Sequence, residues 1–168
     1  MLEYDFEKSI GYWVASTAHA LRRALDVELS REGITFRQWE VLAWIAAEGE
    51  QSQVELADRL CIEAPTLAGI LSRMERDGWL VRYACPDDRR CKRIRVTEKA
   101  EQVWNKAVEC CHLIRSQATN GISEDDLAGF RRVCSTILTN LGEPGRPSVG
   151  PATLFVRAET NSLDTETA

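Results

Sequence analysis

The spacing of apolar residues changes twice along this 168-residue sequence, and the change limits the folds that the chain can adopt. In residues 9–77 and again in 97–141, apolar side chains recur every three or four positions, which predicts amphipathic helices. Between these regions, 79–83 and 93–96 are short runs rich in strand-forming residues, separated by a polar, turn-rich loop. We therefore expect a mainly α-helical protein with one small β-hairpin.

Capping residues divide the first helical region into four helices. Thr35-x-x-Gln38 and Ser52-x-x-Glu55 are capping boxes, in which a hydroxyl accepts a free backbone amide and the longer side chain reaches back. Pro65 suits the first turn of a further helix, because an amide at that position has no partner within the helix. The predicted helices, including those after the hairpin, are 9–31, 35–48, 52–60, 64–77, 97–117 and 123–141.

The order of these elements is that of a winged helix-turn-helix with additional helices at both ends. Residues 61–64 would form a turn of the length that a helix-turn-helix requires. After residue 141 prolines and glycines interrupt the sequence, and its end is polar and acidic, which predicts a mostly disordered tail. The predicted organisation is an N-terminal dimerisation helix in 1–34, a winged helix-turn-helix core in 35–96, C-terminal dimerisation helices in 97–141 and the tail in 142–168.

Three apolar stripes lie outside the predicted core, in 9–31, 97–117 and 123–141. Together they present more apolar surface than a core formed by 35–96 can cover. A second copy of the chain would cover this surface, which predicts a homodimer. A helical bundle formed within one chain is the alternative.

Positive charge is concentrated in one segment of an acidic chain. The net charge is −5, whereas residues 64–95 hold eight basic and four acidic residues, a net charge of +4. Such a segment is typical of a nucleic-acid-binding surface, although a solvated charged face has the same composition. We expect the helix at 64–77 to enter the major groove of double-stranded DNA and the hairpin loop to reach the adjacent minor groove. The predicted DNA-binding residues are Ser52, Gln53, Pro65, Thr66, Gly69, Ser72, Arg73, Asp88, Arg89, Arg90 and Lys92.

The side chains in this set have different expected roles. Arg73 can pair bidentately with guanine or hold a phosphate, and Lys92, together with Arg93 and Arg95, can reach phosphates without reading the sequence. Asp88 is expected to orient a neighbouring guanidinium rather than to touch DNA. Gly69 either permits close approach to the DNA backbone or accommodates packing within the protein.

Three segments, 62–67, 74–78 and 88–101, resemble the MarR family of transcriptional regulators, and its SlyA-like branch in particular. The most specific part is the D-x-R hairpin signature at 88–90, which is followed by a strand and a V-T-x-x-A sequence. The likeness extends over about residues 9–141. It implies an obligate homodimer that binds an inverted-repeat operator.

The resemblance also implies roles for individual residues. Asp88 and Arg90 correspond to the family's hairpin aspartate and minor-groove arginine, and Thr66 corresponds to a Ser/Thr of the recognition helix. Gly69 departs from the SlyA-like pattern, which often has arginine at this position. The operator sequence of SlyA-like proteins therefore cannot be transferred to this chain.

Two input signals are compatible with the sequence. By resemblance, Arg22 and Trp39 fall near a cleft between the dimer helices and the DNA-binding core. There Arg22 would pair with the carboxylate of a small aromatic anion, and Trp39 would stack on its ring. Alternatively, Trp39 is a core residue and Arg22 lies on the surface.

The second signal is oxidation. Cys85 and Cys91 flank the hairpin tip beside several cations, which favour the reactive thiolate, and a disulfide there would reshape the tip. Two unreactive thiols are the alternative. The other cysteines are interpreted as packing residues: Cys61, Cys110, Cys111 and Cys134.

Other classes of protein are disfavoured. The sequence has none of the common hydrolase, metalloprotease, P-loop or dinucleotide-binding motifs, so we expect no enzyme, no cofactor and no metal site. With neither a membrane span nor a signal sequence in view, we expect a cytoplasmic protein. A winged-helix module that binds proteins instead of DNA remains an alternative, but the basic segment disfavours it.

Overall fold

The computed structural model describes residues 5–84 and 92–142. The helices are η1 (Phe6–Lys8), a single 3-10 turn, then α1 (Ile10–Arg31), α2 (Phe36–Glu48), α3 (Gln53–Leu60), α4 (Ala64–Arg76), α5 (Glu98–Thr119) and α6 (Glu124–Asn140). The strands are β1 (Gln51–Ser52), β2 (Leu80–Ala84) and β3 (Lys92–Val96). The predicted fold class, a mainly helical winged helix-turn-helix with helices at both ends, is confirmed. All but the first residue of the predicted tail lies outside the described residues.

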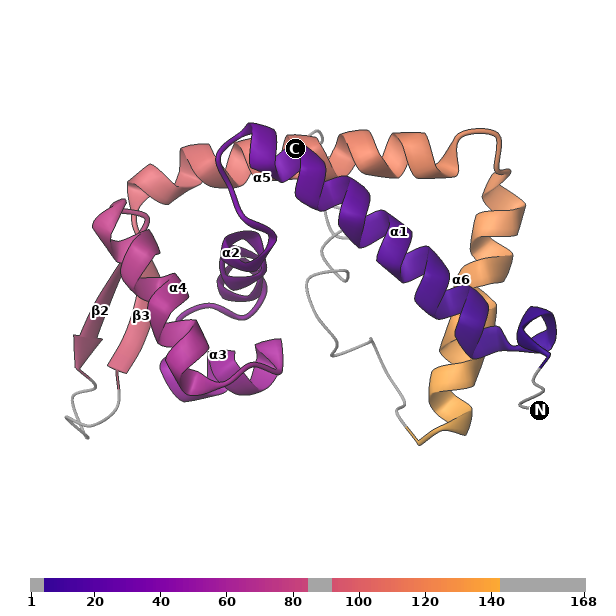
Figure 1. The fold of residues 1–168 in the computed structure, drawn as a ribbon, viewed down its shortest axis with the longest axis horizontal. Helices are drawn as coiled ribbons and strands as arrows, with labels where there is room; N and C mark the ends of the chain where they lie inside the picture. Colours follow the sequence, from indigo (N-terminus) through magenta and orange to yellow (C-terminus); the bar gives the residue numbers. More distant parts are fainter. Residues whose placement is uncertain (1–4, 85–91, 143–168) are drawn as a thin grey trace, which may run out of the picture.

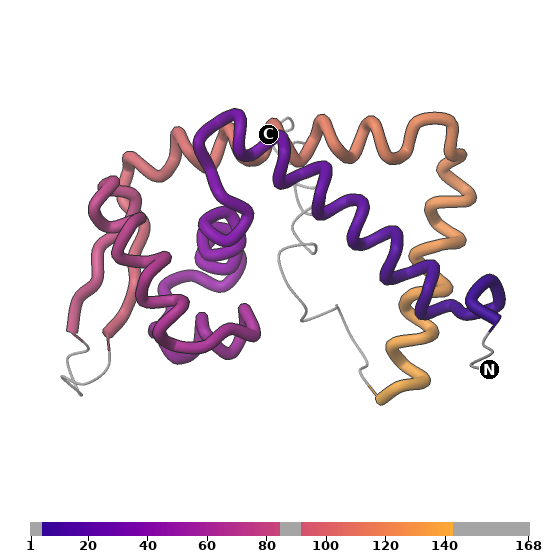
Figure 2. Tube along the Cα trace, viewed as in Figure 1, coloured from indigo at the N-terminus to yellow at the C-terminus, as the bar shows by residue number. Residues whose placement is uncertain are grey.

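The chain is arranged as one lobe with long helices extending from it. In Figure 1, α2, α3, α4 and the two hairpin strands gather into what we call the winged lobe, the described part of residues 36–96. Helix α5 leads away from this lobe to α6, which turns back at the far end of the molecule. The Cα trace in Figure 2 shows that the N-terminal end of α1 also lies far from the winged lobe. We call residues 10–21 of α1 and all of α6 the arms.

The sheet has three antiparallel strands in the order β1-β3-β2. The predicted hairpin is present, with Leu80 opposite Val96 and Ala84 opposite Lys92. The third strand, β1, was not predicted: Gln51 and Ser52 pair with β3 beside Ile94 and Arg93. A two-residue strand has no periodicity of its own, so only its distant partner in β3 reveals it.

Two clusters of buried side chains hold the fold together. One fills the winged lobe, and its fully buried members include Leu56, Leu67, Leu71, Met74 and Ile94. The other joins the second half of α1 to α2 and to the middle of α5, through residues that include Leu29, Ile34, Trp39, Ala107 and Ile114. The stripes predicted for these helices therefore form the interior, and burial of each large aliphatic side chain contributes about 1.5–3 kcal/mol.

The arms carry apolar stripes that the chain itself leaves uncovered. Helix α6 has no buried residue, and Phe130 and Leu141 are 59% and 74% exposed. Near the start of α1, Ile10 and Trp13 are 60% and 57% exposed. Within the described residues, the chain itself thus covers the stripe of α5 and the second half of that of α1, as the one-chain bundle would, but it leaves the arms uncovered. None of the described helices combines the length and apolar character that a membrane crossing requires.

Candidate DNA-binding interface

Helix α4 presents its predicted site residues on one exposed face. Pro65 lies in its first turn, and the backbone turns away at Gly78, which has a φ of +77°. Four residues, Leu67, Ile70, Leu71 and Met74, are buried on the inner side and attach the helix to the winged lobe. The outer side holds the exposed predicted residues Pro65, Thr66, Gly69, Ser72 and Arg73. The amphipathic pattern thus supplies a rigid base for five of the predicted site residues.

Gly69 faces open space. A Cβ atom built on this glycine would have no heavy atom within 4 Å in the described residues, apart from its chain neighbours and the backbone of its own helix, and its φ is not in the left-handed region. Packing within the described part of the chain therefore does not require glycine at this position. This geometry does not favour the packing interpretation of Gly69, and close approach to the DNA backbone stays a prediction.

Ser52 and Gln53 lie at the start of α3. The Ser52 hydroxyl accepts a hydrogen bond from the Glu55 amide at 3.2 Å, and the Ser52 amide donates to the Glu55 carboxylate at 2.7 Å. These bonds form the predicted capping box. Both residues are only half-exposed, and Ser52 also pairs with β3. Ser52 therefore has a structural task in addition to any contact with DNA.

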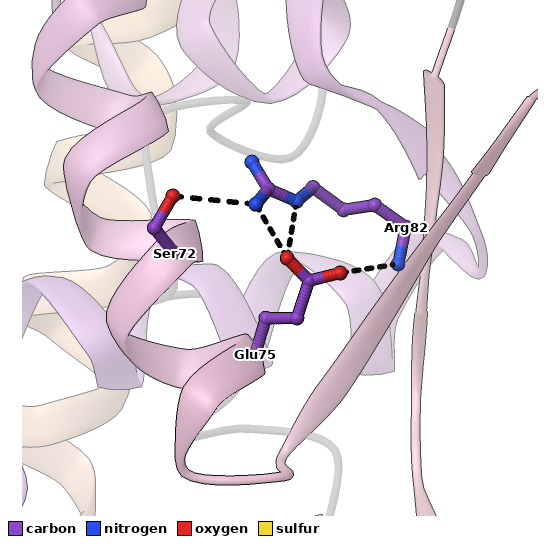
Figure 3. Close-up of polar contacts among 3 residues, drawn as sticks. All are labelled: Ser72, Glu75 and Arg82. Carbon is purple, nitrogen blue, oxygen red and sulfur yellow. Dashed lines mark hydrogen bonds and ion pairs between the residues drawn. The ribbon is translucent and has the colours of Figure 1, made fainter.

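Arg82 joins the hairpin strand β2 to α4 (Figure 3). Its backbone amide donates to Glu75 Oε1 at 3.3 Å, and its Nε donates to Glu75 Oε2 at 2.9 Å. One terminal nitrogen also donates to Glu75 Oε2 and, at 3.2 Å, to the Ser72 hydroxyl. Hydrogen bonds from Arg82 hold the pKa of Glu75 below its ordinary value. Neither Glu75 nor Arg82 was among the predicted site residues, because no local pattern shows that β2 returns to α4.

A second ionic network joins the two hairpin strands to the residue before β1. The Tyr83 hydroxyl and Arg95 Nε both donate to the Glu50 carboxylate, and the Arg95 guanidinium lies 5.1 Å from the centre of the Tyr83 ring. The hydrogen bond from Tyr83, followed by that from Arg95, lowers the pKa of Glu50. Arg95 was expected to reach phosphates, but its charge is already offset by this carboxylate.

The ion pairs divide the basic segment into two groups. Arg76, Arg82 and Arg95 each pair with a carboxylate: Asp77, Glu75 and Glu50, respectively. By contrast, Arg73, Lys92 and Arg93 are exposed and form no ion pair with another described residue. The cations that remain available to phosphates in the described part of the segment are therefore these three.

Five predicted residues lie outside the described residues. They are Cys85, Asp88, Arg89, Arg90 and Cys91. Their roles in minor-groove binding and in oxidation stay predictions.

A cleft of about 740 Å³ lies between α1, α2 and α4. Its lining is His19, Arg22, Arg23, Asp26, Thr35, Phe36, Arg37, Thr66, Ile70 and Arg73. Arg22 lines this cleft, and its guanidinium is 4.4 Å from the centre of the Phe36 ring. Trp39 does not line the cleft, because its ring is only 3% exposed and packs in the core beside Phe36. Trp39 is therefore a core residue, which is the alternative given for it above, and the aromatic ring that lines the cleft is that of Phe36, which was not among the predicted site residues.

The described cysteines are not alike. Cys110 and Cys111 are buried, as predicted, and burial raises the pKa of both thiols, that of Cys111 to about 12. Raised pKa values make these thiols poor nucleophiles. Cys61 was wrongly interpreted as a packing residue: it is exposed and ends α3 with a left-handed φ of 49°.

A short helix, a second helix with one exposed polar face and a β-hairpin, all built on one core, define a winged helix-turn-helix protein of the DNA-binding type. The MarR family model matches residues 34–92. The crystal structure of transcriptional regulator PA3341 is 34% identical, with 80% of this chain and 98% of that chain covered and a TM-score of 0.69. The chain belongs to the MarR family of transcriptional regulators.

Two further solved structures share the fold. A mutant MarR from E. coli complexed with operator DNA is 22% identical, with 81% of this chain and 99% of that chain covered and a TM-score of 0.68. The PcaV transcriptional regulator from Streptomyces coelicolor, in complex with its natural ligand, is 22% identical, with 83% and 98% covered and a TM-score of 0.66. At this identity the likeness concerns the fold.

Proposed function

We propose that this protein is a homodimeric transcription regulator that binds an inverted-repeat operator in double-stranded DNA. The observation that carries the proposal is the exposed face of α4, where Thr66, Ser72 and Arg73 stand on a buried base. Lys92 and Arg93 of β3, which form no ion pair with another described residue, supplement this face. The SlyA-like character of the chain remains a proposal that depends on the hairpin sequence at 88–101.

The arms support the homodimer. Their exposed apolar side chains belong to helices at the two ends of the described chain, and both lie away from the winged lobe (Figure 1). A second copy would cover them without touching the face of α4. Two-fold symmetry then repeats the recognition helix about one DNA turn away, ~34 Å, so the operator should be an inverted repeat.

Selection from a random duplex library tests this function. We expect the purified chain to enrich an inverted repeat, and its affinity for that duplex to fall steeply as salt rises, because phosphate contacts release counterions. Gel filtration with light scattering should give the mass of a dimer. A protein that enriches no duplex at low salt would refute DNA binding and favour the protein-interaction module, and a monomeric mass would refute the homodimer.

We propose in addition that a small aromatic anion modulates DNA binding from the cleft between α1, α2 and α4. Arg22 supplies a guanidinium group there and Phe36 supplies an aromatic ring, whereas Arg37, which also lines the cleft, already pairs with Glu40. A carboxylate on an aromatic ring suits this combination.

Calorimetry with benzoate tests the ligand site, and benzyl alcohol serves as a neutral control of similar shape. We expect benzoate to bind more tightly than benzyl alcohol, and Arg22→Gln to remove the difference, because the guanidinium pairs with the carboxylate. Equal binding of the two compounds, or no binding of either, would refute an anion site.

Oxidation of Cys85 and Cys91 is the alternative input, whereas the buried Cys110 and Cys111 have raised pKa values and are poor candidates for a redox role. If oxidation is the signal, peroxide should release operator DNA from the wild type and not from Cys85→Ser. Equal release from both proteins would exclude this pair.

A further inference from the structure

The contacts of Arg82 connect two parts of the surface proposed to bind DNA. Ser72 and Glu75 lie on α4, whereas Arg82 lies on β2, the strand that precedes the hairpin loop in the sequence. Arg82 is opposite the buried Ile94 in the sheet, so its side chain is on the sheet face that packs toward the interior. A single side chain thus spans the recognition helix and the hairpin.

The Glu75 carboxylate holds β2 in both position and orientation. One of its oxygens accepts the backbone amide of Arg82, and the other accepts two nitrogens of the guanidinium (Figure 3). Charge-assisted bonds of this kind are roughly twice as strong as bonds between neutral groups and are directional. They hold the middle of β2 against α4 within the winged lobe.

The same guanidinium constrains the Ser72 hydroxyl. A hydroxyl has one donor hydrogen and two acceptor lone pairs, and Arg82 occupies one lone pair with a bond of 3.2 Å. The hydrogen of Ser72 is left to donate, and the adjacent positive charge polarises the O–H bond. An exposed serine at this position is therefore prepared to donate to an acceptor on DNA, such as a phosphate oxygen or guanine O6.

We propose that Arg82 is a positioning residue for DNA recognition, which fixes the hairpin against the recognition helix and prepares Ser72 as a hydrogen-bond donor. This inference rests on the proposed function. Arg82 acts through Ser72 and β2 and does not touch DNA itself. The Arg82 side chain is only 20% exposed, and its charge is offset by Glu75. By contrast, Arg73, which lies on α4 with Glu75, is exposed and forms no ion pair with another described residue.

The salt dependence of DNA binding distinguishes a residue that positions other groups from one that contacts a phosphate. Removal of one phosphate contact should lower the slope of log affinity against log salt by about 1. We expect Arg82→Gln and Glu75→Gln to lower the ratio of operator affinity to unrelated-duplex affinity by about tenfold while leaving the slope unchanged. Arg73→Gln should lower the slope. Fluorescence anisotropy with the selected operator and a scrambled duplex, at several salt concentrations, measures both quantities.

Lys106→Gln is the charge-matched control. This change also removes one cation from an exposed ion pair, that with Glu32, but the pair joins α5 to the end of α1 outside the winged lobe. Its specificity ratio and its slope should equal those of the wild type. Circular dichroism and gel filtration of every variant check that the fold and the dimer persist, and Glu75→Gln, which keeps the shape of the side chain, serves if Arg82→Gln does not fold.

A double-mutant cycle tests the role of Ser72. Ser72→Ala should reduce operator affinity in the wild type. It should cause little further loss in Arg82→Gln, because in that variant Ser72 already lacks the hydrogen bond from Arg82 that orients its hydroxyl. An equal loss in both backgrounds would overturn the proposed link. So would a lower slope for Arg82→Gln, or an unchanged specificity ratio. If the wild type selects no operator at all, the proposed function has failed, which is a distinguishable result.

Discussion

The winged lobe and the arms use similar amphipathic helices with opposite results. In the winged lobe, the stripe of α4 is buried, and Leu67, Leu71 and Met74 are all 0% exposed. In the arms, the stripe of α6 contains no buried residue, although its composition is comparable. An apolar stripe therefore predicts that a helix has a buried face but does not say which chain covers it. In the winged lobe the cover is the chain itself, and in the arms we propose a second copy.

The largest effect should follow from a cavity in the winged lobe. Leu71→Ala removes a side chain that is 0% exposed, and we expect it to lower the free energy of unfolding by about 2–5 kcal/mol. Chemical denaturation followed by circular dichroism measures the loss. Val54→Ala is the control, because Val54 is 69% exposed in the same lobe and should change stability by less than about 0.5 kcal/mol. Similar losses for both variants would contradict the assigned core.

A charge in an arm should separate the two copies and leave the lobe folded. Phe130 is 59% exposed in the single chain, so Phe130→Asp should change the stability of one copy little. It does, however, place a carboxylate in the proposed interface. We expect the dimer dissociation constant to rise at least about a hundredfold, as for a hot-spot residue. Sedimentation at several concentrations measures this change. An unaltered dissociation constant would exclude α6 from the interface.

Two matched serine caps sharpen the comparison at a smaller scale. Ser52 caps α3 in the winged lobe, and Ser123 caps α6 in an arm by accepting the Asp126 amide at 3.1 Å. Ser52→Ala should cost about 1 kcal/mol of lobe stability, because a helix amide loses its acceptor. Ser123→Ala should weaken the dimer and spare the lobe. Denaturation and sedimentation of both variants distinguish the two losses, and the reverse pattern would contradict the division into lobe and arms.

The smallest effect concerns pH. Hydrogen bonds from Arg82 lower the pKa of Glu75 in the folded lobe, so the ionised carboxylate stabilises the fold above its ordinary pKa. That stability is lost as pH falls through the lowered value, because the unfolded chain then binds a proton first. We expect lobe stability to fall on acidification from about pH 6 to about pH 3, and less so in Glu75→Gln. Denaturation at several pH values measures the difference, and identical profiles would show that Glu75 is not coupled to folding.

The elements of the winged lobe were predicted well because their signals are local. The capping boxes at Thr35 and Ser52 form as predicted, since both partners lie within three residues. The exposed face of α4 was likewise visible from its spacing. Trp39 was misplaced because a large aromatic on an amphipathic helix suits a core and a ligand cleft equally, and only the packing of α1 and α5 around it decides between them.

The arrangement of charges could not be predicted in the same way. The composition of residues 64–95 revealed a basic segment, but it did not reveal which cations are already paired. Glu75 and Arg82 are seven positions apart on different elements, and Glu50 and Arg95 are 45 apart. Such partners meet only after the chain has folded.

Local chemistry was thus enough for the helices, their ends and the β-hairpin, because hydrogen bonds and side-chain periodicity within a few residues specify them. Tertiary contacts were needed for the strand β1, the burial of Trp39, the cleft beside Phe36 and the pairing of Arg82 with Glu75. Each of these depends on contacts between different helices and strands, which are decided by how the two cores pack and not by neighbours in the chain.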